Sequence, residues 1–485
     1  GVYQQGYNLF ALDVASKQIT QLTNFDSSNR AQFIRLSPTE DQIVYSSGPN
    51  ERLSIFVMSL RGGQPVQITN DEASDEYPIW LPDGKRIMYS SKRSGIYQTC
   101  IAYVVEKRSE QINLGLEDTL ISDVTSDGSK ILFYQSREAS DLWSVGIDDK
   151  TETRVTSDSG LEIWPDVSPD GETIVFQSTT EFKHLLEGSI TMRPIHDEQE
   201  VNVTSNGFSP TFSPDGGKLA FLRYAGDRIT LWTVGRNGDN ERQLTAREIG
   251  FSGFSQTPFN RAQVKDYSWS PDGGSLIYCA KEDGLWNVWQ ISANGGDPRQ
   301  ISKNTNPDTV VSCPLFIPDS RQIAFSSRTG RTADITKITK IVVADGEKDK
   351  DVFASESAFK LIGRKQPDSF VIAIPESNPS AKPIKVKLVL VSLDRSTLEI
   401  ASVDNAYFHN IRLSPDGQRI AIVTRQQGGD EIRVISSSGG GSSRIVTNTD
   451  PNEYVSEIAW SPDSRTIYYG KQRQSRMISM IENFK

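Results

Sequence analysis

The chain is poor in the residues that build disulfide frameworks and metal sites. Its 485 residues include only 3 Cys and 3 His, and no Cys-x-x-Cys pair occurs. A sparse, odd set of cysteines excludes an evident disulfide framework, and the missing pair excludes an evident zinc site. Of Cys100, Cys279 and Cys313, Cys279 stands in an apolar run and is predicted to lie in the core.

Long apolar runs are also missing. No stretch of about 18 or more apolar residues occurs, so the sequence predicts no transmembrane helix. No signal-peptide pattern is present, and the first residue is Gly1 rather than Met. The mean hydropathy of −0.44 is typical of a soluble protein. We therefore expect any membrane anchor to lie outside this chain.

The sequence lacks the common catalytic and cofactor motifs. The Gly-x-Ser-x-Gly elbow of α/β-hydrolases is absent, and Gly250-Phe-Ser-Gly253 does not have its spacing. Phosphate loops, dinucleotide fingerprints and EF-hand loops are absent too. We predict no catalytic residue, no metal ligand and no cofactor. The Asp-rich turns are compatible with structural calcium ions, but no calcium-binding motif is present.

The charge balance is acidic, with 62 Asp and Glu against 52 Lys and Arg and a net charge of −10. An acidic chain repels the phosphate backbone, so we predict that this segment does not bind nucleic acid.

One phrase recurs along the whole chain. Its clearest copies are Trp80–Tyr89, Val167–Phe176, Phe212–Phe221 and Trp269–Tyr278, each with Pro-Asp-Gly near its start. The Pro of the phrase, or the residue in its place, stands at 38, 82, 126, 169, 214, 271, 318, 367, 415 and 462. A period of about 45 residues indicates a repeat architecture.

Each repeat reads as four short strands. Pro-Asp-Gly favours a tight turn, and alternating apolar residues on both sides predict a β-hairpin with one buried face. A third strand follows, often with an aromatic residue, as in Leu231-Trp232. A short fourth strand ends in Thr or Ser, as in Gln67-Ile-Thr69 and Gln243-Leu-Thr245. Four strands in about 45 residues are typical of one propeller blade.

The fold class is therefore predicted to be all-β: a β-propeller of four-stranded blades with about ten repeats. Segments 8–13 and 18–23 resemble third and fourth strands, and the chain ends with a first, a second and a third strand. The N-terminal strands are thus expected to complete the C-terminal blade. This favours a single closed array over residues 1–485. Two smaller propellers are the alternative, with a break near 246–264, where the repeat spacing is widest.

The phrase W/F-S-P-D-G-x-x-I-x-F/Y, followed by a strand and Gln-Leu-Thr, resembles the TolB-like propeller repeats (PD40), which are related to WD40 repeats. The resemblance covers nearly the whole chain. It is closest to the C-terminal extracytoplasmic sensor regions of bacterial membrane-anchored winged-helix regulators and Ser/Thr kinases. It implies a non-catalytic propeller at the periplasmic or extracellular face that binds a protein, a peptide or a small ligand.

The resemblance leaves two alternatives open. One is a TolB-like periplasmic scaffold for protein interactions. The other is the propeller of a prolyl-oligopeptidase-type peptidase without its hydrolase domain. The genes that encode these three classes differ outside the propeller, so the repeats alone do not separate them.

Ligands of propellers usually bind at the channel mouth, on the loops that lead into the first strands. In this chain those positions lie five to seven residues before the Pro of each repeat. The candidate ligand-binding residues at these positions are Asp75, Glu76, Glu162, Lys265, Asp266, His409 and Glu457. Because most of them are acidic, the mouth is expected to favour a cationic peptide or a metal ion.

Overall fold

The fold is all-β throughout the part of the chain that the computed structural model describes. That part comprises residues 2–5, 8–25, 31–48, 52–70, 73–93, 96–112, 118–157, 160–179, 188–225, 228–246, 249, 266–317, 321–330, 338–366, 368–377 and 383–482. Within it, no helix has the length and apolarity that crossing a bilayer requires.

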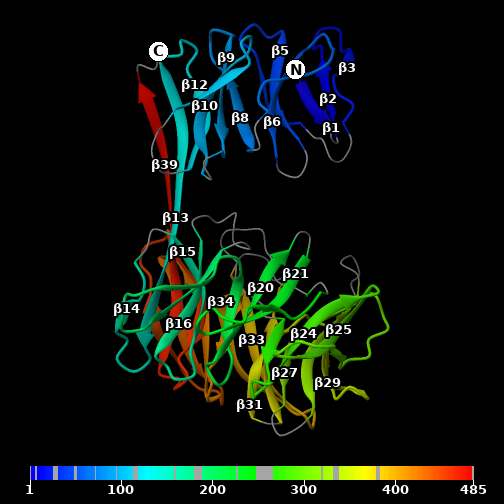
Figure 1. Cartoon of the computed structure of the whole chain (residues 1–485), viewed down its shortest axis with the longest axis vertical. Helices are drawn as coiled ribbons and strands as arrows, with labels where there is room; N and C mark the ends of the chain where they lie inside the picture. The colour runs from blue at the N-terminus through cyan, green and yellow to red at the C-terminus, as the bar shows by residue number, and fades with distance from the viewer. Residues whose placement is uncertain are drawn as a thin grey trace. The chain divides into compact units, whose positions relative to one another are not determined.

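The chain folds into two compact units. Unit 1 comprises residues 1–137 and 474–485, and unit 2 comprises residues 138–473. The chain enters unit 2 within β13 (Lys130–Gly146) and leaves it within β39 (Thr466–Glu482), and these two strands are neighbours in one sheet (Figure 1). The predicted single array over the whole chain is therefore not confirmed. The break considered near 246–264 lies almost entirely outside the described residues.

Unit 2 consists of four-stranded antiparallel sheets in the predicted order. The first four are β15 (Leu161–Val167), β16 (Thr173–Thr179), β17 (Ser189–Pro194) and β18 (Val201–Thr204); β19 (Phe208–Phe212), β20 (Lys218–Ala225), β21 (Arg228–Gly235) and β22 (Arg242–Gln243); β23 (Tyr267–Trp269), β24 (Ser275–Glu282), β25 (Leu285–Ser292) and β26 (Arg299–Gln300); and β27 (Thr309–Phe316), β28 (Ile323–Thr329), β29 (Ile338–Ala344) and β30 (Asp349–Ser355).

Two further sheets share a long strand. They are β31 (Lys360–Gln366), β32 (Ser369–Pro375), β33 (Ile384–Ser392) and β34 (Thr397–Leu413), and then β34 again with β35 (Arg419–Gln426), β36 (Gly429–Ser436) and β37 (Ser442–Thr447). The first part of β34 pairs with β33 and its last part pairs with β35. One strand thus ends one blade and begins the next.

The last blade of unit 2 joins strands from distant parts of the sequence. β38 (Glu453–Trp460) and β39 are followed in the sheet by β13 and β14 (Glu152–Arg154). Glu152 accepts hydrogen bonds from the Tyr469 hydroxyl at 2.5 Å and from Lys471 Nζ at 2.9 Å. The prediction that segments 8–13 and 18–23 complete this blade is wrong. β13 is one continuous strand, and its second half takes the place of the third strand in this blade.

The blades of unit 2 form a closed ring of seven within the described residues. The innermost strands contact each other in the cycle β15, β19, β23, β27, β31, β34, β38 and back to β15. The step from β19 to β23 is made by Tyr267, whose hydroxyl donates to the Ser209 carbonyl, and by Trp269 Nε1, which donates to the Thr211 carbonyl at 3.4 Å. Each sheet therefore covers the apolar face of the next, as a propeller requires.

Unit 1 holds the remaining repeats. Its strands are β1 (Val2–Gln5), β2 (Asn8–Leu12) and β3 (Ile19–Gln21); β4 (Gln32–Leu36), β5 (Gln42–Ser47), β6 (Ser54–Ser59) and β7 (Val66–Gln67); β8 (Asp75–Trp80), β9 (Arg86–Ser91), β10 (Gln98–Tyr103) and β11 (Arg108–Ile112); and β12 (Asp118–Val124) with the first half of β13. The second half of β39 joins the last of these sheets, where Ser479 Oγ donates to Gln135 Oε1 at 3.1 Å.

Hydrogen bonds within the Ser-Pro-Asp-Gly turn explain the recurrence of the phrase. Ser213 Oγ donates to Asp215 Oδ1 at 2.6 Å and accepts the backbone N–H of Lys218 at 2.9 Å. Asp215 Oδ1 also accepts the N–H of Gly217, and these bonds hold the pKa of its carboxyl below the ordinary value. Gly216 has a positive φ of 70°, which favours glycine at this corner. The hydrogen bonds of the turn are therefore sufficient to explain why the repeat has Asp at this position.

The Gln-x-Thr phrase of the fourth strand is explained in the same way. Gln67 Nε2 donates to the carbonyl of Thr69 at 2.9 Å, and Thr69 Oγ1 accepts the N–H of Ile55 at the third strand. Gln243 and Thr245 form equivalent bonds in β22 and to Leu231 of β21. These side chains satisfy backbone groups where the two-residue fourth strand ends.

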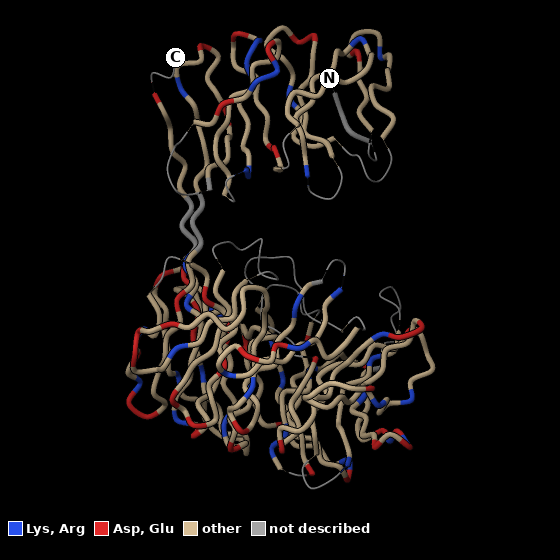
Figure 2. Tube along the Cα trace, in the orientation of Figure 1, with Lys and Arg blue, Asp and Glu red and all other residues tan. Residues whose placement is uncertain are grey.

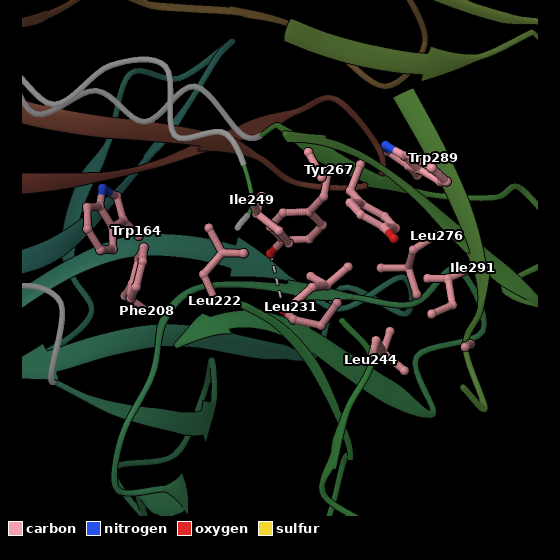
Figure 3. Packing of buried hydrophobic residues seen from close by; sticks show 14 of the residues in the cluster. Trp164, Phe208, Leu222, Leu231, Leu244, Ile249, Tyr267, Leu276, Trp289 and Ile291 are labelled. Carbon is pink, nitrogen blue, oxygen red and sulfur yellow. Dashed lines mark hydrogen bonds between the residues drawn. The ribbon is translucent and has the colours of Figure 1, made fainter. Parts of the chain in front are cut away.

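Adjacent blades pack face to face through apolar side chains. Leu222 and Leu231 of one sheet pack with Tyr267 and Leu276 of the next, and all four are buried (Figure 3). The Tyr267 hydroxyl reaches the Ala220 carbonyl at 3.3 Å. A buried tyrosine thus contributes apolar area and also satisfies its own polar group.

Several innermost strands contain a β-bulge with a strained residue. Tyr77, Trp164, Ser209 and Cys313 have φ between 53° and 60°, and each precedes a proline. The strand register shifts at each of these positions. These prolines lie inside the strands. Bulges re-aim the side chains that follow.

Candidate ligand site

A cavity of about 380 Å³ lies among the innermost strands of unit 2. Its volume is within the range of small-ligand sites. Six strands contribute to it, namely β15, β19, β23, β27, β31 and β34. The residues that line it include Asp166, Thr211, Phe212, Tyr267, Ser268, Trp269, Cys313, Pro314, Leu315, Lys360, Leu361, Ile362, Ile411 and Arg412.

The lining follows one repeat position that the sequence analysis did not select. The residue three places before the repeat Pro faces the cavity in five blades. These residues are Asp166, Thr211, Ser268, Leu315 and Arg412. The sequence analysis chose positions five to seven places before the Pro. Because successive side chains alternate across a strand, the residue immediately before the apolar residue that begins each phrase was the position to examine.

Two cationic side chains meet in the cavity. Lys360 of β31 is buried, and its Nζ donates to the His409 carbonyl at 2.7 Å. Arg412 of β34 donates from Nη1 to the same carbonyl at 3.3 Å and to the Ile411 carbonyl at 3.1 Å. Burial, followed by the neighbouring guanidinium, lowers the pKa of Lys360 to about 7. Burial also lowers the pKa of Arg412.

Asp266 and Cys313 lie close enough to Lys360 to influence its charge. The Asp266 carboxylate accepts the backbone N–H of Cys313 at 3.0 Å, and its charge acts to raise the pKa of Lys360. Burial raises the pKa of the Cys313 thiol to about 12, and the charge of Asp266 adds to the shift. Asp166 forms an equivalent bond to the N–H of Phe212 at 2.8 Å. Both carboxylates thus fasten one blade to the next.

His409 and Glu457 complete the charged groups around the cavity. Burial, together with the charges of Lys360 and Arg412, lowers the pKa of His409 to about 4. The imidazole is therefore neutral at pH 7. Glu457 is buried on β38, and its charge acts to raise the pKa of Arg412. The two cations of the cavity thus have carboxylates nearby on separate strands.

The predicted site residues are only partly brought together. Asp266, His409 and Glu457 surround Lys360 and Arg412 in unit 2. Whether they contact a ligand stays a prediction. The lining adds two cations that the predicted acidic mouth did not contain.

The other predicted residues lie elsewhere or have structural partners. Glu162 is buried on β15, where its carboxylate accepts the Thr156 hydroxyl. Asp75 and Glu76 lie at the start of β8 in unit 1, and Glu76 accepts the Tyr97 hydroxyl at 2.7 Å. Lys265 lies outside the described residues.

The arrangement favours recognition of a small polar molecule. Among the described residues, no group of three or more His, Cys, Asp and Glu side chains is placed to hold a metal ion. The cavity instead combines aromatic and aliphatic walls with an amine, a guanidinium, the Asp166 carboxylate and several hydroxyls. Apolar walls with a few convergent polar groups are typical of ligand sites.

Comparison with known proteins identifies the type of repeat. Residues 3–191 match the family model of the TolB beta propeller domain, PD40. The repeats of this segment are similar to those of that family. Sequence relatives include an uncharacterized protein of Agrobacterium fabrum, 27% identical over 35% of this chain and 62% of its own. They also include dipeptidyl-peptidase 5 of Aspergillus fumigatus, 27% identical over 33% of this chain and 24% of its own. The Tol-Pal system protein TolB of Francisella tularensis is 24% identical over 47% of this chain and 52% of its own.

This chain thus spans from about a quarter to about three-fifths of the length of these relatives. Similar solved structures include a putative TolB from Agrobacterium tumefaciens, with a TM-score of 0.40 and 17% identity over 69% of this chain and 98% of its own. The tricorn protease has a TM-score of 0.49 and 13% identity over 91% of this chain and 45% of its own.

Proposed function

We propose that this chain is a non-catalytic extracytoplasmic sensor propeller of a bacterial signalling protein, and that unit 2 binds its ligand in the channel cavity. The ligand is a small molecule or an end of a peptide. The observation that carries the proposal is the cavity itself, where side chains from six innermost strands converge. A ring of blades holds such a site rigidly, which lowers the cost of ordering on binding.

Two alternatives have specific support. The TolB-named relative favours a scaffold that binds partner proteins. The dipeptidyl-peptidase-named relatives favour a propeller that accompanies a hydrolase domain. The sensor reading is preferred because the buried Lys360 and the half-buried Arg412 inside the cavity suit recognition of one small group better than contact with a broad protein surface.

The test is a thermal-unfolding screen with the full chain against short peptides, sugars and carboxylic acids. A ligand at about 100 times its Kd stabilises the folded state by about 2.7 kcal/mol. We expect the wild-type Tm to rise by several degrees with at least one compound. Ser268→Trp fills the cavity and is expected to abolish the rise, while Ser292→Trp, at an exposed position of β25, is expected to retain it.

The result that contradicts the proposal is equal stabilisation of all three proteins, which places the ligand outside the cavity. A partner protein that is captured equally by the wild type and Ser268→Trp, with no small compound active, favours the scaffold.

A further inference from the structure

Lys360 is unusual because an amine is buried inside a cavity rather than extended to solvent. Its side chain is 8% exposed, and its Nζ donates to one backbone carbonyl, that of His409. Lysine is almost never fully buried unless it is paired. Among the described residues, Lys360 forms no ion pair with a carboxylate within 4.0 Å. Apart from this one bond to the next blade, the turns and the ring closure of unit 2 do not use the amine.

The surroundings of Lys360 favour the neutral amine. Burial and the Arg412 guanidinium lower its pKa, while Asp266 and Cys313 act in the opposite direction, and the result is about 7. A substantial fraction of the side chain is therefore unprotonated at pH 7. A desolvated lysine beside a second cationic group is the arrangement that activates an amine as a nucleophile towards carbonyl carbon.

The side chains that line the cavity beside Lys360 indicate which class of ligand its amine would bind. Lys360 and Arg412 lie on neighbouring strands and line the same cavity. Guanidinium groups recognise carboxylates with a planar fork. A molecule that carries a carbonyl next to a carboxylate would place the carbonyl at Lys360 and the carboxylate at Arg412.

We propose that Lys360 captures a small carbonyl compound that bears a carboxylate, such as a 2-oxo acid, as a reversible imine in the channel of unit 2. The inference rests on the proposed function only in taking the cavity as the ligand site.

The reaction needs no partner beyond the ligand. The amine nitrogen attacks the carbonyl carbon and forms a C–N bond. The carbonyl oxygen then leaves as water with two protons, both of which come from the ammonium form of Lys360. A C=N bond replaces the C=O bond, the positive charge stays on nitrogen, and no oxidant or reductant is consumed. Water reverses the step when the ligand concentration falls.

Reductive trapping tests the proposal in the full chain. Glyoxylate is added at pH 7 with cyanoborohydride, which reduces the iminium to a stable secondary amine, and peptide mass spectrometry measures the label at each lysine. Lys365 is the matched control, because it lies on the same strand and its Nζ donates to the Ser437 carbonyl and Ser438 Oγ. We expect label at Lys360 to exceed that at Lys365 by at least about tenfold, since burial and the Arg412 guanidinium lower the pKa of Lys360 and activate its amine at pH 7.

Two further arms separate the parts of the proposal. Lys360→Arg is expected to lose the label at 360 while the label at Lys365 is unchanged. Acetaldehyde, which has no carboxylate, is expected to favour Lys360 over Lys365 less strongly than glyoxylate does. Equal ratios for the two reagents would overturn the role of Arg412, and a Lys360 label no stronger than that of Lys365 would overturn the capture.

Failure of this inference differs from failure of the proposed function. If Lys360 is not labelled, yet a compound from the thermal screen still stabilises the wild type and not Ser268→Trp, the cavity binds a ligand by other means and only the imine is wrong. If Ser268→Trp blocks the label as well, the amine is reached through the cavity.

Discussion

Replacing Lys360 with Met is expected to stabilise unit 2 at neutral pH. The side chain is buried, and its pKa falls from 10.5 to about 7 on folding. A shift of this size corresponds to a cost on the order of 4 kcal/mol for keeping the charged form in the folded state. Met has a similar length, is apolar and adapts to irregular space. The free energy of unfolding of unit 2 is therefore expected to rise by an amount of that order.

The pH dependence of this gain identifies its cause. The unfolded chain binds a proton at Lys360 below pH 10.5, and the folded chain does so only below about pH 7. Wild-type stability therefore falls as the pH is lowered from about 10.5 to about 7, and below about pH 7 the full cost remains without further change. The advantage of Lys360→Met is expected to be largest at and below about pH 7 and to vanish above about pH 10.5.

Urea unfolding of both proteins at several pH values measures the difference. Lys365→Met on the same strand is the control; Lys365 is half-buried with its amine on Ser437 and Ser438, and the change is expected to alter stability by about 1 kcal/mol or less. If Lys360→Met instead destabilises the unit at pH 7, the amine contributes a stabilising ion pair. The claim that burying the charged lysine lowers the stability of unit 2 is then wrong.

The two units are expected to respond separately to the loss of a core aromatic. Tyr45 of unit 1 and Phe221 of unit 2 occupy the same place in their repeats, and both are fully buried. Tyr45 stacks on Phe56 with ring centres 5.8 Å apart, and Phe221 stacks on Trp232 at 6.4 Å. Replacing either with Ala is expected to cost its own unit about 3–5 kcal/mol, through lost burial and the cavity left behind.

Hydrogen exchange followed by mass spectrometry localises these effects. Peptides from 31–60 and from 208–245 are expected to exchange faster in Tyr45→Ala and in Phe221→Ala respectively, each without change in the other unit. Faster exchange over the whole chain in both variants would show one cooperative array rather than two units.

The repeats could be predicted from the sequence because each conserves its own local chemistry. The Ser-Pro-Asp-Gly turn and the Gln-x-Thr end are held by bonds between residues only a few places apart or in adjacent strands. Such local interactions require the same residues in every repeat and so produce a pattern that can be recognised in the sequence. The order of four strands and the burial of Cys279 followed from them and are confirmed.

The division into two units could not be predicted from the repeat spacing, because the spacing stays the same where the chain passes from one unit to the other. In most repeats a loop separates the second strand from the third. In β13 and β39 the two are one continuous strand of 17 residues. Other repeats place Gly, Asn or Pro in that loop, as at Gly284 and Gly428. Segments 135–140 and 471–476 contain none of these residues. This missing turn chemistry was the available signal.

The candidate site was predicted only in part. Asp266, His409 and Glu457 were chosen for their place before the first strands, and they surround the cavity cations. Lys360 was missed because its repeat has the weakest phrase, with Gly absent after Pro367-Asp368. Its burial depends on the bulged strands of neighbouring blades, which no local pattern in the sequence indicates.

Closure of unit 2 by β13 and β14 is the central claim, and a zero-length cross-link tests it most directly. Lys471 Nζ lies 2.9 Å from Glu152 Oε2, across residues 319 places apart. Treatment of the full chain with a carbodiimide is expected to yield a peptide pair joined through Lys471 and Glu152, and Glu152→Gln is expected to remove it. A link from Lys471 to Asp13 instead would mean that the N-terminal strands complete the blade, and it would contradict the closed seven-bladed ring.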